Sequence, residues 1–425
     1  MNVRPYGCAI VGGGPAGMML GYLLARAGVD VVVLEKHGDF LRDFRGDTVH
    51  PSTTTVMQEL DLLDTFLARP HDEVDSIVAD FDGQRITMAN FRHAAGPLKS
   101  LVIMPQWDFL DFLAEHARRW SSFHLEMNAE VIALTTEGDR IAGVRVRTMD
   151  GVHDVPARLV VGADGRRSVV RARAGLAVEE LGAPIDVLWF RLPRRSIDGA
   201  PPFLRATRGR IGALIPRHDY YQCGVIVPKG AFEEIRPRGL AAFREDVATI
   251  FPFLRDRVGE LRDWERVKLL TVTIDRLKRW ARPGLLCIGD AAHAMSPIGG
   301  VGINLAIQDA VATANLLAEE LAFGETPILE DLDRVQRRRE LPTRLTQSLQ
   351  IMVQNAVLGP ALESHAKVVA PWPIRALDRL GLLQRITARV IGTGIRPEHV
   401  QSPRWHELSR VATIPPPSRP RPSTA

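Results

Sequence analysis

Gly12-Gly13-Gly14-Pro15-Ala16-Gly17 is the stretch that decides the fold of this chain. A short apolar run at residues 8–11 precedes it, and a segment rich in Ala, Leu and Met follows it as far as Ala27. Gly28 is expected to cap that helix, and residues 31–34 form a second apolar run. The order strand, glycine loop, helix and strand predicts a βαβ unit within a parallel sheet.

The glycines of this loop have separate expected tasks. Gly12 allows the tight turn off the strand, Gly14 lets the backbone approach a pyrophosphate, and Gly17 lets the helix pack closely on the sheet. The start of the helix, at Pro15 and Ala16, then directs free N–H groups and the positive end of its dipole at the phosphates. A glycine turn that binds nothing is the alternative.

Glu35 stands 23 residues after Gly12, at the end of the second apolar run. A carboxylate there can accept hydrogen bonds from ribose hydroxyls and repels a 2′-phosphate. The loop is therefore predicted to hold FAD or NAD, and Lys36 is included in the predicted site.

A later signature, Gly289-Asp290-Ala291-Ala292-His293, favours FAD over NAD. Asp290 follows the apolar run 285–288, where its carboxylate can bind ribityl hydroxyls. The glycine-rich loop 297–302 then leads into a helix predicted over 303–322, so its N–H groups can stabilise charge on a reduced isoalloxazine. An ordinary connection with Asp290 as a helix N-cap is the alternative. The residues predicted to contact flavin here are Asp290, Pro297, Gly300, Gly302, Ile303 and Asn304.

A third signature, Gly162-Ala163-Asp164-Gly165, lies between the other two. With all three in this order, residues 5–325 resemble the single-component FAD-dependent aromatic hydroxylases, the group of para-hydroxybenzoate hydroxylase. The resemblance implies that this motif contacts flavin and nicotinamide, through Asp164, Gly165, Arg167 and Arg171. It also implies that Arg45 and Gln106 contact the FAD, a surface position being the alternative for each.

The resemblance implies an α/β fold in three parts: a Rossmann-like FAD-binding domain of the glutathione-reductase type, an inserted β-sheet substrate domain and C-terminal helices. The predicted ranges are 1–72, 100–180 and 272–330 for the FAD-binding domain, 73–99 and 181–271 for the substrate domain, 331–400 for the helices and 401–425 for a disordered Pro-rich tail. Helices are expected at 52–68, 107–120 and 239–250, and a meander at 123–147.

The activity implied by the resemblance is monooxygenation. NAD(P)H, a transient co-substrate, reduces FAD, and O2 then forms a flavin C4a-hydroperoxide that hydroxylates a planar aromatic small molecule. Arg42, Arg45 and Arg167 are candidate phosphate contacts for NAD(P)H, although a solvated arginine is the alternative for each. Two rival functions stay open: a flavin oxidoreductase of the same fold without oxygen insertion, and a flavin-bound protein that shields an intermediate without turnover.

Substrate residues are expected in the β-rich segment 183–230. Alternation places Trp189 and Arg191 on one face and Leu188 and Phe190 on the other, and either pair could face the substrate. Candidate pocket residues are Arg191, Tyr221 and, beside the flavin, Pro297; Tyr220 and Gln222 are weaker candidates. His293 is interpreted as a hydrogen-bonded structural residue, and no catalytic acid or base is assigned.

The segment from Pro373 is predicted to be one amphipathic helix. It places Ile374, Leu377, Leu380, Leu383 and Ile386 on one face and arginines elsewhere. Packing against the body of the protein or a second subunit, which a homodimer would provide, is favoured over a helix lying in a membrane interface.

Composition narrows the remaining choices. The 425 residues carry 54 basic and 50 acidic side chains, a net charge of +4 that is dispersed, so nucleic acid is not an expected partner. Cys8, Cys223 and Cys287 lie in separate apolar runs and predict buried free thiols, with no metal site. We expect no signal peptide and no membrane span, and a cytoplasmic location.

Overall fold

Apolar runs that are far apart in the sequence lie side by side in one parallel sheet. In the computed structural model, which describes residues 4–41, 48–364 and 366–412, the order of these strands is β20-β11-β1-β2-β8. Neighbouring strands in this series run parallel. Their bounds are β1 (Tyr6–Val11), β2 (Val31–Leu34), β8 (Phe123–Glu126), β11 (Gly151–Gly162) and β20 (Leu285–Cys287). The centres of β1, β2 and β20 and the last four residues of β11 are buried, which their continuous apolar runs require.

The three signature motifs meet at one edge of this sheet. Strands β20, β11 and β1 are neighbours, and each runs directly into one motif. Because parallel strands end at the same edge, the three loops converge there, where open α/β sheets bind ligands.

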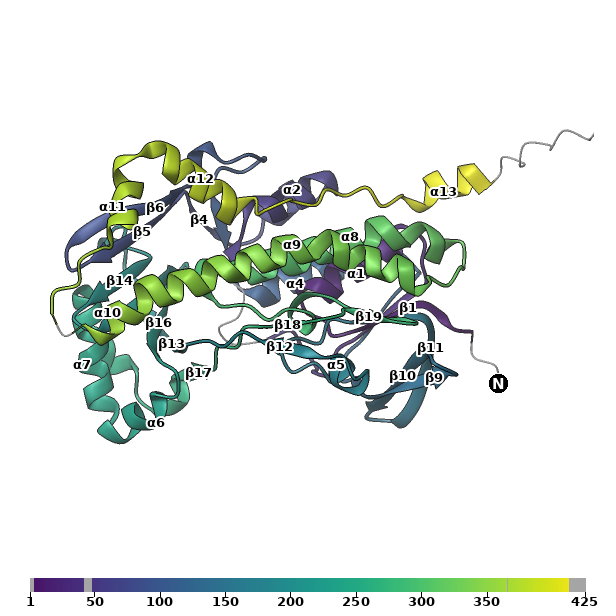
Figure 1. Ribbon diagram of the computed structural model, residues 1–425, viewed down its shortest axis with the longest axis horizontal. Helices are drawn as coiled ribbons and strands as arrows, with labels where there is room; N and C mark the ends of the chain where they lie inside the picture. The colour runs from purple at the N-terminus through teal and green to yellow at the C-terminus, as the bar shows by residue number, and fades with distance from the viewer. Residues whose placement is uncertain (1–3, 42–47, 365, 413–425) are drawn as a thin grey trace, which may run out of the picture.

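Helices cover one face of the sheet (Figure 1). These are α1 (Pro15–Arg26), α4 (Gln106–Ala117) and α8 (Gly302–Ala322), with α9 (Leu329–Val353) outside α8 and running on toward the second sheet. The predicted cap is confirmed: Gly28 has a φ of +83°, and the Val29 N–H bonds the Leu24 carbonyl at 3.0 Å. Residues 298–322 are long and apolar enough to cross a membrane, but 83% of the apolar 18-residue stretch within them is buried in the core of the protein.

Two predicted elements differ in the structure. The meander consists of β9 (Glu130–Glu137), β10 (Arg140–Thr148) and β11, whereas β8 pairs parallel with β2. Helix α4 carries the chain back across the sheet, so β8 starts in the same direction as β2. The helix predicted at 52–68 is two, α2 (Pro51–Glu59) and α3 (Leu63–Leu67), because Asp61 has a φ of +60° that no helix continues.

A second sheet lies at the other end of the molecule, with the order β17-β13-β16-β15-β14-β5-β6 (Figure 1). Its strands are β5 (Ser76–Phe81), β6 (Gln84–Asn90), β13 (Ile185–Pro193), β14 (Leu204–Thr207), β15 (Arg210–Pro216), β16 (Tyr220–Pro228) and β17 (Lys268–Leu270). All pairs are antiparallel except β14 with β5. One face packs on α7 (Leu240–Ile250) through a core that includes Leu188 and Phe190.

Several short elements connect these parts. They are β3 (Thr48–Val49), β4 (Asp72–Val74) and β7 (Leu101–Ile103) in one small sheet, β12 (Val178–Glu180) with β18 (Asp275–Leu277) in another, β19 (Ala281–Arg282) beside β20, and helices α5 (Val169–Arg173), α6 (Phe232–Ile235) and α10 (Gly359–Glu363).

The single amphipathic helix predicted from Pro373 is instead a pair. Helices α11 (Trp372–Arg379) and α12 (Gly381–Gly392) meet at Leu380, whose φ of −117° and ψ of 92° are not helical. Both helices pack on β6, which agrees with the favoured expectation of packing against the body of the protein. The Thr87 N–H donates to Asp378 Oδ1 at 3.3 Å. The break turns Leu380 out to solvent.

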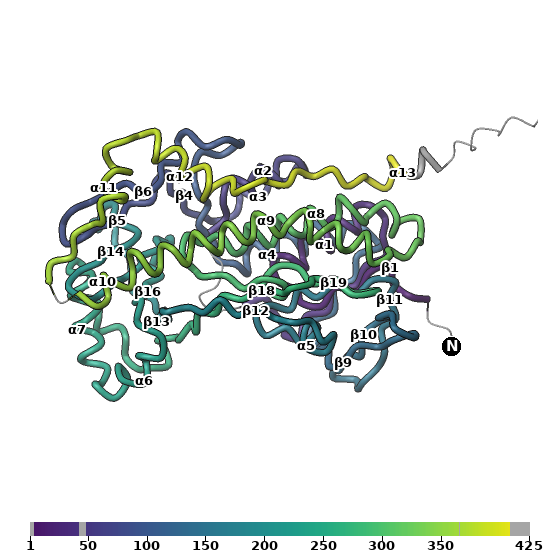
Figure 2. Tube along the Cα trace, in the orientation of Figure 1, coloured from purple at the N-terminus to yellow at the C-terminus, as the bar shows by residue number. Residues whose placement is uncertain are grey.

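The predicted start of the disordered tail, residue 401, is too early in the chain. Residues 401–412 are ordered and end in α13 (Trp405–Ala412), after a segment that returns past α2 toward α1 (Figure 2). Arg26 Nη1 donates to the Ser402 carbonyl at 2.9 Å, and the Trp405 ring covers Gly28 so closely that a side chain there would overlap it. These contacts order residues that composition alone assigns to a tail; residues 413–425 lie outside the described part.

Candidate active site

One cavity of about 1210 Å³ joins the motif edge of the first sheet to the second sheet. Its walls include the glycine loop at residues 11–16, the Asp164 loop, residues 295–306, and one face of the second sheet. Helices α9, α11 and α12, from the C-terminal part of the chain, contribute a further part of its wall. The volume exceeds that of an ordinary small-molecule pocket, so an elongated cofactor and a substrate fit together.

The glycine loop leaves space where a pyrophosphate is expected. Gly12 has a φ of +104°, and a side chain there would overlap the Ala163 carbonyl. A side chain at Gly17 would overlap the Gly12 carbonyl, so α1 packs tightly on the turn. A Cβ at Gly14, by contrast, would meet no atom of the described residues within 4 Å, although Gly14 lines the cavity. Because no described side chain caps α1, these residues fit a bound diphosphate.

Glu35 is 8% exposed and binds the backbone of its surroundings. Its Oε2 accepts from the Gly13 N–H at 2.9 Å, and its Oε1 accepts from the His37 N–H at 3.0 Å. Glu35 and Lys36 both line the cavity. The carboxylate therefore holds the glycine loop in shape at the position expected for the ribose.

The two acidic motif residues differ in their partners. Asp290 Oδ2 accepts from Arg166 Nε at 3.0 Å, with both side chains about one-third exposed to the cavity. Asp164 Oδ2 accepts from the Val169 and Val170 N–H groups at 2.7 and 3.1 Å, which caps α5. Burial raises the pKa of Asp164. Asp290 thus presents the more accessible carboxylate.

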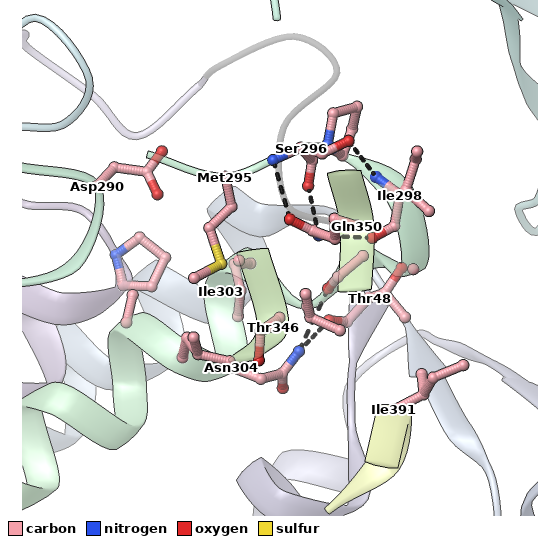
Figure 3. A pocket seen from close by; sticks show the side chains of 18 of the residues that line it. Thr48, Asp290, Met295, Ser296, Ile298, Ile303, Asn304, Thr346, Gln350 and Ile391 are labelled. Atoms are coloured by element: carbon pink, nitrogen blue, oxygen red, sulfur yellow. Dashed lines mark hydrogen bonds between the residues drawn. The ribbon is translucent and has the colours of Figure 1, made fainter. Parts of the chain in front are cut away.

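Asn304 connects the loop that is predicted to face the flavin to the start of α2. Its Oδ1 accepts from the His50 N–H at 2.9 Å and from Thr53 Oγ1 at 2.7 Å, and its Nδ2 donates to the Thr48 carbonyl at 3.2 Å (Figure 3). The side chain is buried. Beyond its predicted flavin contact, Asn304 fixes the loop that Pro297, Gly300, Gly302 and Ile303 contribute to the cavity wall.

A row of buried glutamines on α9 and the turn after it was not foreseen. Gln350 accepts from the Ser296 N–H at 3.2 Å and donates to the Ser296 and Ile298 carbonyls at 3.0 and 2.9 Å (Figure 3). Gln347 donates to the Ala294 carbonyl, and Gln354 donates to Ser296 Oγ. Glutamines spaced by three and four residues on one helix face were the available signal.

A buried ionic cluster supports the motif at residues 289–293 from behind. Asp309 is fully buried; its Oδ2 contacts His293 Nε2 at 2.6 Å and accepts from the Gly289 N–H at 3.0 Å. Its Oδ1 accepts from Arg339 Nε at 2.9 Å, and Arg339 also reaches Glu398 at 3.3 Å. His293 therefore has the structural role predicted for it.

Other predicted cofactor contacts have mixed placements. Gln106 begins α4, is buried and lines the cavity, while Arg167 lines it from an exposed position. Arg171 is not among the lining residues, because its guanidinium pairs with Asp275 at 3.1 Å. Arg42 and Arg45 lie outside the described residues.

Two of the three candidate pocket residues do not line the cavity; only Pro297 does. Strand β13 turns Val187 and Trp189 toward it, but Arg191 lies near the strand end, over the rings of Trp107 and Tyr220. Tyr221 faces the core beneath α7, where burial raises its pKa to about 12. Gln222, its neighbour on the opposite face, lines the cavity.

Comparisons with known proteins agree with this geometry. Residues 6–347 match the FAD binding domain family. The 6-methylpretetramide 4-monooxygenase of Streptomyces rimosus is 34% identical over 384 residues, covering 90% of this chain and 91% of that protein. The chain belongs to the FAD-dependent aromatic hydroxylase family. The predicted α/β fold and the assignment as an FAD-dependent monooxygenase are confirmed.

Further relatives cover most of this monooxygenase. The rifampicin monooxygenase of Streptomyces venezuelae is 30% identical over 390 residues, which is 89% of this chain and 78% of that protein. The crystal structure of PqsL, a probable FAD-dependent monooxygenase from Pseudomonas aeruginosa, is 25% identical with a TM-score of 0.69 and covers 84% of this chain and 98% of that one.

Asp290→Ala is expected to yield folded monooxygenase that purifies without FAD. The carboxylate is one-third exposed, faces the cavity and can bind flavin hydroxyls, whereas its own ion pair contributes little to folding. The flavin absorbance per protein after gel filtration measures the loss. Asp139→Ala, at an exposed hairpin turn, is the matched control. A variant as yellow as wild type would contradict the role of Asp290.

His50 predicts a pH dependence of stability. It is fully buried, its Nδ1 donates to the Ile391 carbonyl at 2.7 Å, and burial lowers its pKa to about 4. Below an unfolded pKa of about 6.5, the unfolded chain binds a proton that the folded chain does not. The free energy of unfolding should therefore fall as the pH falls, by about 2 kcal/mol between pH 7 and pH 5 from this residue.

The measurement is urea unfolding of wild type and His50→Gln at several pH values. The difference in unfolding free energy between the two proteins should change by that amount from pH 7 to pH 5, because all other titratable groups contribute equally to both proteins. Parallel pH profiles would show that His50 does not titrate as described.

Proposed function

We propose that this monooxygenase hydroxylates a neutral, multi-ring and largely apolar substrate, with NAD(P)H as the electron donor and O2 as the oxygen source. When bound, FAD supplies the redox chemistry, so that one oxygen atom enters the substrate, the other leaves as water and NAD(P)H is oxidised. The protein supplies binding, orientation and a dry site.

The absence of charge in the substrate half of the cavity carries this proposal. The second sheet contributes apolar side chains and Gln222, and α11 and α12 contribute apolar side chains and Thr387. The charged lining residues of the described chain are Glu35, Lys36, Glu130, Asp164, Arg166, Arg167, Asp290 and Arg339, all outside those elements. A substrate carboxylate would lose its hydration there without a cationic partner, which is costly.

Two lining residues suit an extended aromatic substrate. Trp189 is 8% exposed and offers an indole ring on the wall, and Gln222 adds an amide held by Arg217 at 3.3 Å. Ring packing on the indole would orient the substrate, and the amide would bond a carbonyl or hydroxyl oxygen. Apolar walls would exclude water while oxygen is transferred.

The test compares two probe compounds with the FAD-loaded enzyme, using NADH and NADPH in turn. We expect 6-methylpretetramide, the compound in the name of the Streptomyces rimosus relative, to stimulate NAD(P)H oxidation and to gain one oxygen-18 atom from labelled O2. The small phenolic carboxylate 3-(3-hydroxyphenyl)propionate should do neither. Turnover of the carboxylate alone would overturn the neutral substrate class.

The oxygen label also separates the rival functions. Stimulated NAD(P)H oxidation that converts the substrate without oxygen-18 would indicate an oxidoreductase without oxygen insertion. Tight binding without turnover would indicate a protein that shields an intermediate. The buried free thiols Cys8, Cys223 and Cys287 are consistent with the cytoplasmic location that belongs to this proposal.

A further inference from the structure

Helices α11 and α12 form the outermost layer over β6, at the end of the molecule that holds the second sheet (Figure 1). Their outward positions carry large apolar side chains. Trp372 is 74% exposed, Leu382 is 68% exposed and Ile386 is 51% exposed. The inward positions, such as Ile374 and Ala388, are buried. Each helix therefore has a packed face and a second apolar face that the chain leaves in solvent.

Four arginines share this outer layer. Arg375 and Arg379 lie on α11, Arg385 and Arg389 lie on α12, and all four are exposed. No carboxylate among residues 4–41, 48–364 and 366–412 forms an ion pair with any of them. Asp378, the acidic residue of the two helices, accepts a hydrogen bond from β6 instead. The layer is therefore strongly cationic.

Apolar and cationic side chains alternate on one surface of α12. Leu382, Arg385, Ile386 and Arg389 follow the spacing of three, one and three residues that places side chains on one helix face. A surface with tryptophan, leucine and isoleucine interspersed with arginine matches the headgroup layer of a bilayer, where apolar groups insert and guanidinium groups bind phosphates.

We propose that the outer layer formed by α11 and α12 docks on an anionic lipid bilayer. A second copy of this chain is a poorer occupant, because a two-fold contact sets the same patch against itself. Such a contact would bring the four arginines of one copy against those of the other, and like charges at an interface are repulsive. Anionic phospholipids provide the opposite charge and an apolar layer together.

The cavity opens beside this surface. Leu349 and Met352 on α9 and Ile386 on α12 line the cavity, yet each is more than one-third exposed. These side chains therefore border its mouth, and Ile386 belongs to both the mouth and the docking layer. A docked enzyme would receive apolar compounds directly from the lipid phase. This consequence rests on the proposed substrate class, whereas the docking itself does not depend on it.

The experiment is co-sedimentation of the FAD-loaded protein with vesicles, without substrate. One set contains phosphatidylcholine and phosphatidylglycerol, the other phosphatidylcholine alone. We expect binding to the anionic vesicles only. The fourfold variant Arg375→Gln, Arg379→Gln, Arg385→Gln and Arg389→Gln should bind on the order of a thousandfold more weakly. Trp372→Ala, which keeps the charge, should also weaken binding.

A matched control removes the same charge elsewhere. Arg236 directly follows α6, and Arg255, Arg262 and Arg266 follow α7 in the chain; all four are exposed. Their fourfold change to Gln should leave vesicle binding unchanged. Retained FAD and an unchanged urea midpoint establish that each variant is folded. Equal losses in both fourfold variants, no binding by wild type, or a dimer that the first fourfold variant alone abolishes would each overturn the proposal.

Discussion

Gly14→Val is expected to give a folded protein that cannot retain FAD. Within the part of the chain that the structure describes, a Cβ at Gly14 meets no atom within 4 Å, and the φ of −77° and ψ of −176° of Gly14 suit any residue. The valine would fill the space that a pyrophosphate needs beside the first turn of α1. If the N–H groups at the start of α1 lose two charge-assisted hydrogen bonds to the pyrophosphate, binding weakens by about 3–6 kcal/mol, which is roughly two to four orders of magnitude in Kd.

The measurement is FAD titration of apoprotein, with urea unfolding of the same apoprotein as the stability readout. Gly259→Val is the control, because a Cβ there also meets no atom within 4 Å and the position does not line the cavity. Both variants should unfold like wild type, and only Gly14→Val should lose FAD. Normal FAD affinity in Gly14→Val would place the cofactor elsewhere.

Arg339→Met should have the largest effect on stability, a loss of about 3–5 kcal/mol in the free energy of unfolding. Asp309 and Arg339 are both buried, and their 2.9 Å contact lies at the centre of the cluster with His293 and Glu398. Although burial opposes ionisation, His293 and Arg339 keep the pKa of Asp309 below its ordinary value. Removing the arginine leaves a buried carboxylate poorly compensated.

Urea unfolding checks this expectation, with Arg337→Met, an exposed neighbour on α9, as the control that should change little. Adding Asp309→Asn to Arg339→Met should cost less than the two single losses combined, because the uncompensated charge disappears. FAD content should fall in Arg339→Met, since Asp309 also holds the Gly289 N–H at 3.0 Å. Strictly additive losses would show that the two residues do not act as a pair.

Some features could be predicted because they depend on neighbours in the sequence. The glycine loop, the cap at Gly28 and the apolar runs that become β1, β2 and β20 require only local spacing and backbone preferences. The three motifs converge because each follows a strand of one parallel sheet. The fold, the flavin and the convergence of the three motifs at one edge of the sheet were therefore available from the sequence.

Contacts between residues far apart in the chain could not be predicted from local sequence in this way. Alternation along β13 defines two faces, but only the packing of α7 on one of them decides that Trp189 rather than Phe190 faces the cavity. The break at Leu380 likewise depends on tertiary structure, since α11 and α12 both pack on β6.

The sequence by itself determined the cofactor and the framework, because strand, turn and helix signals act over a few residues. Tertiary structure alone decided which polar side chains support the site: Asp309 meets Arg339 across 30 positions, and Asn304 accepts from the backbone N–H of His50 across 254. Burial forces such groups to find partners, and the fold determines which partners lie within reach.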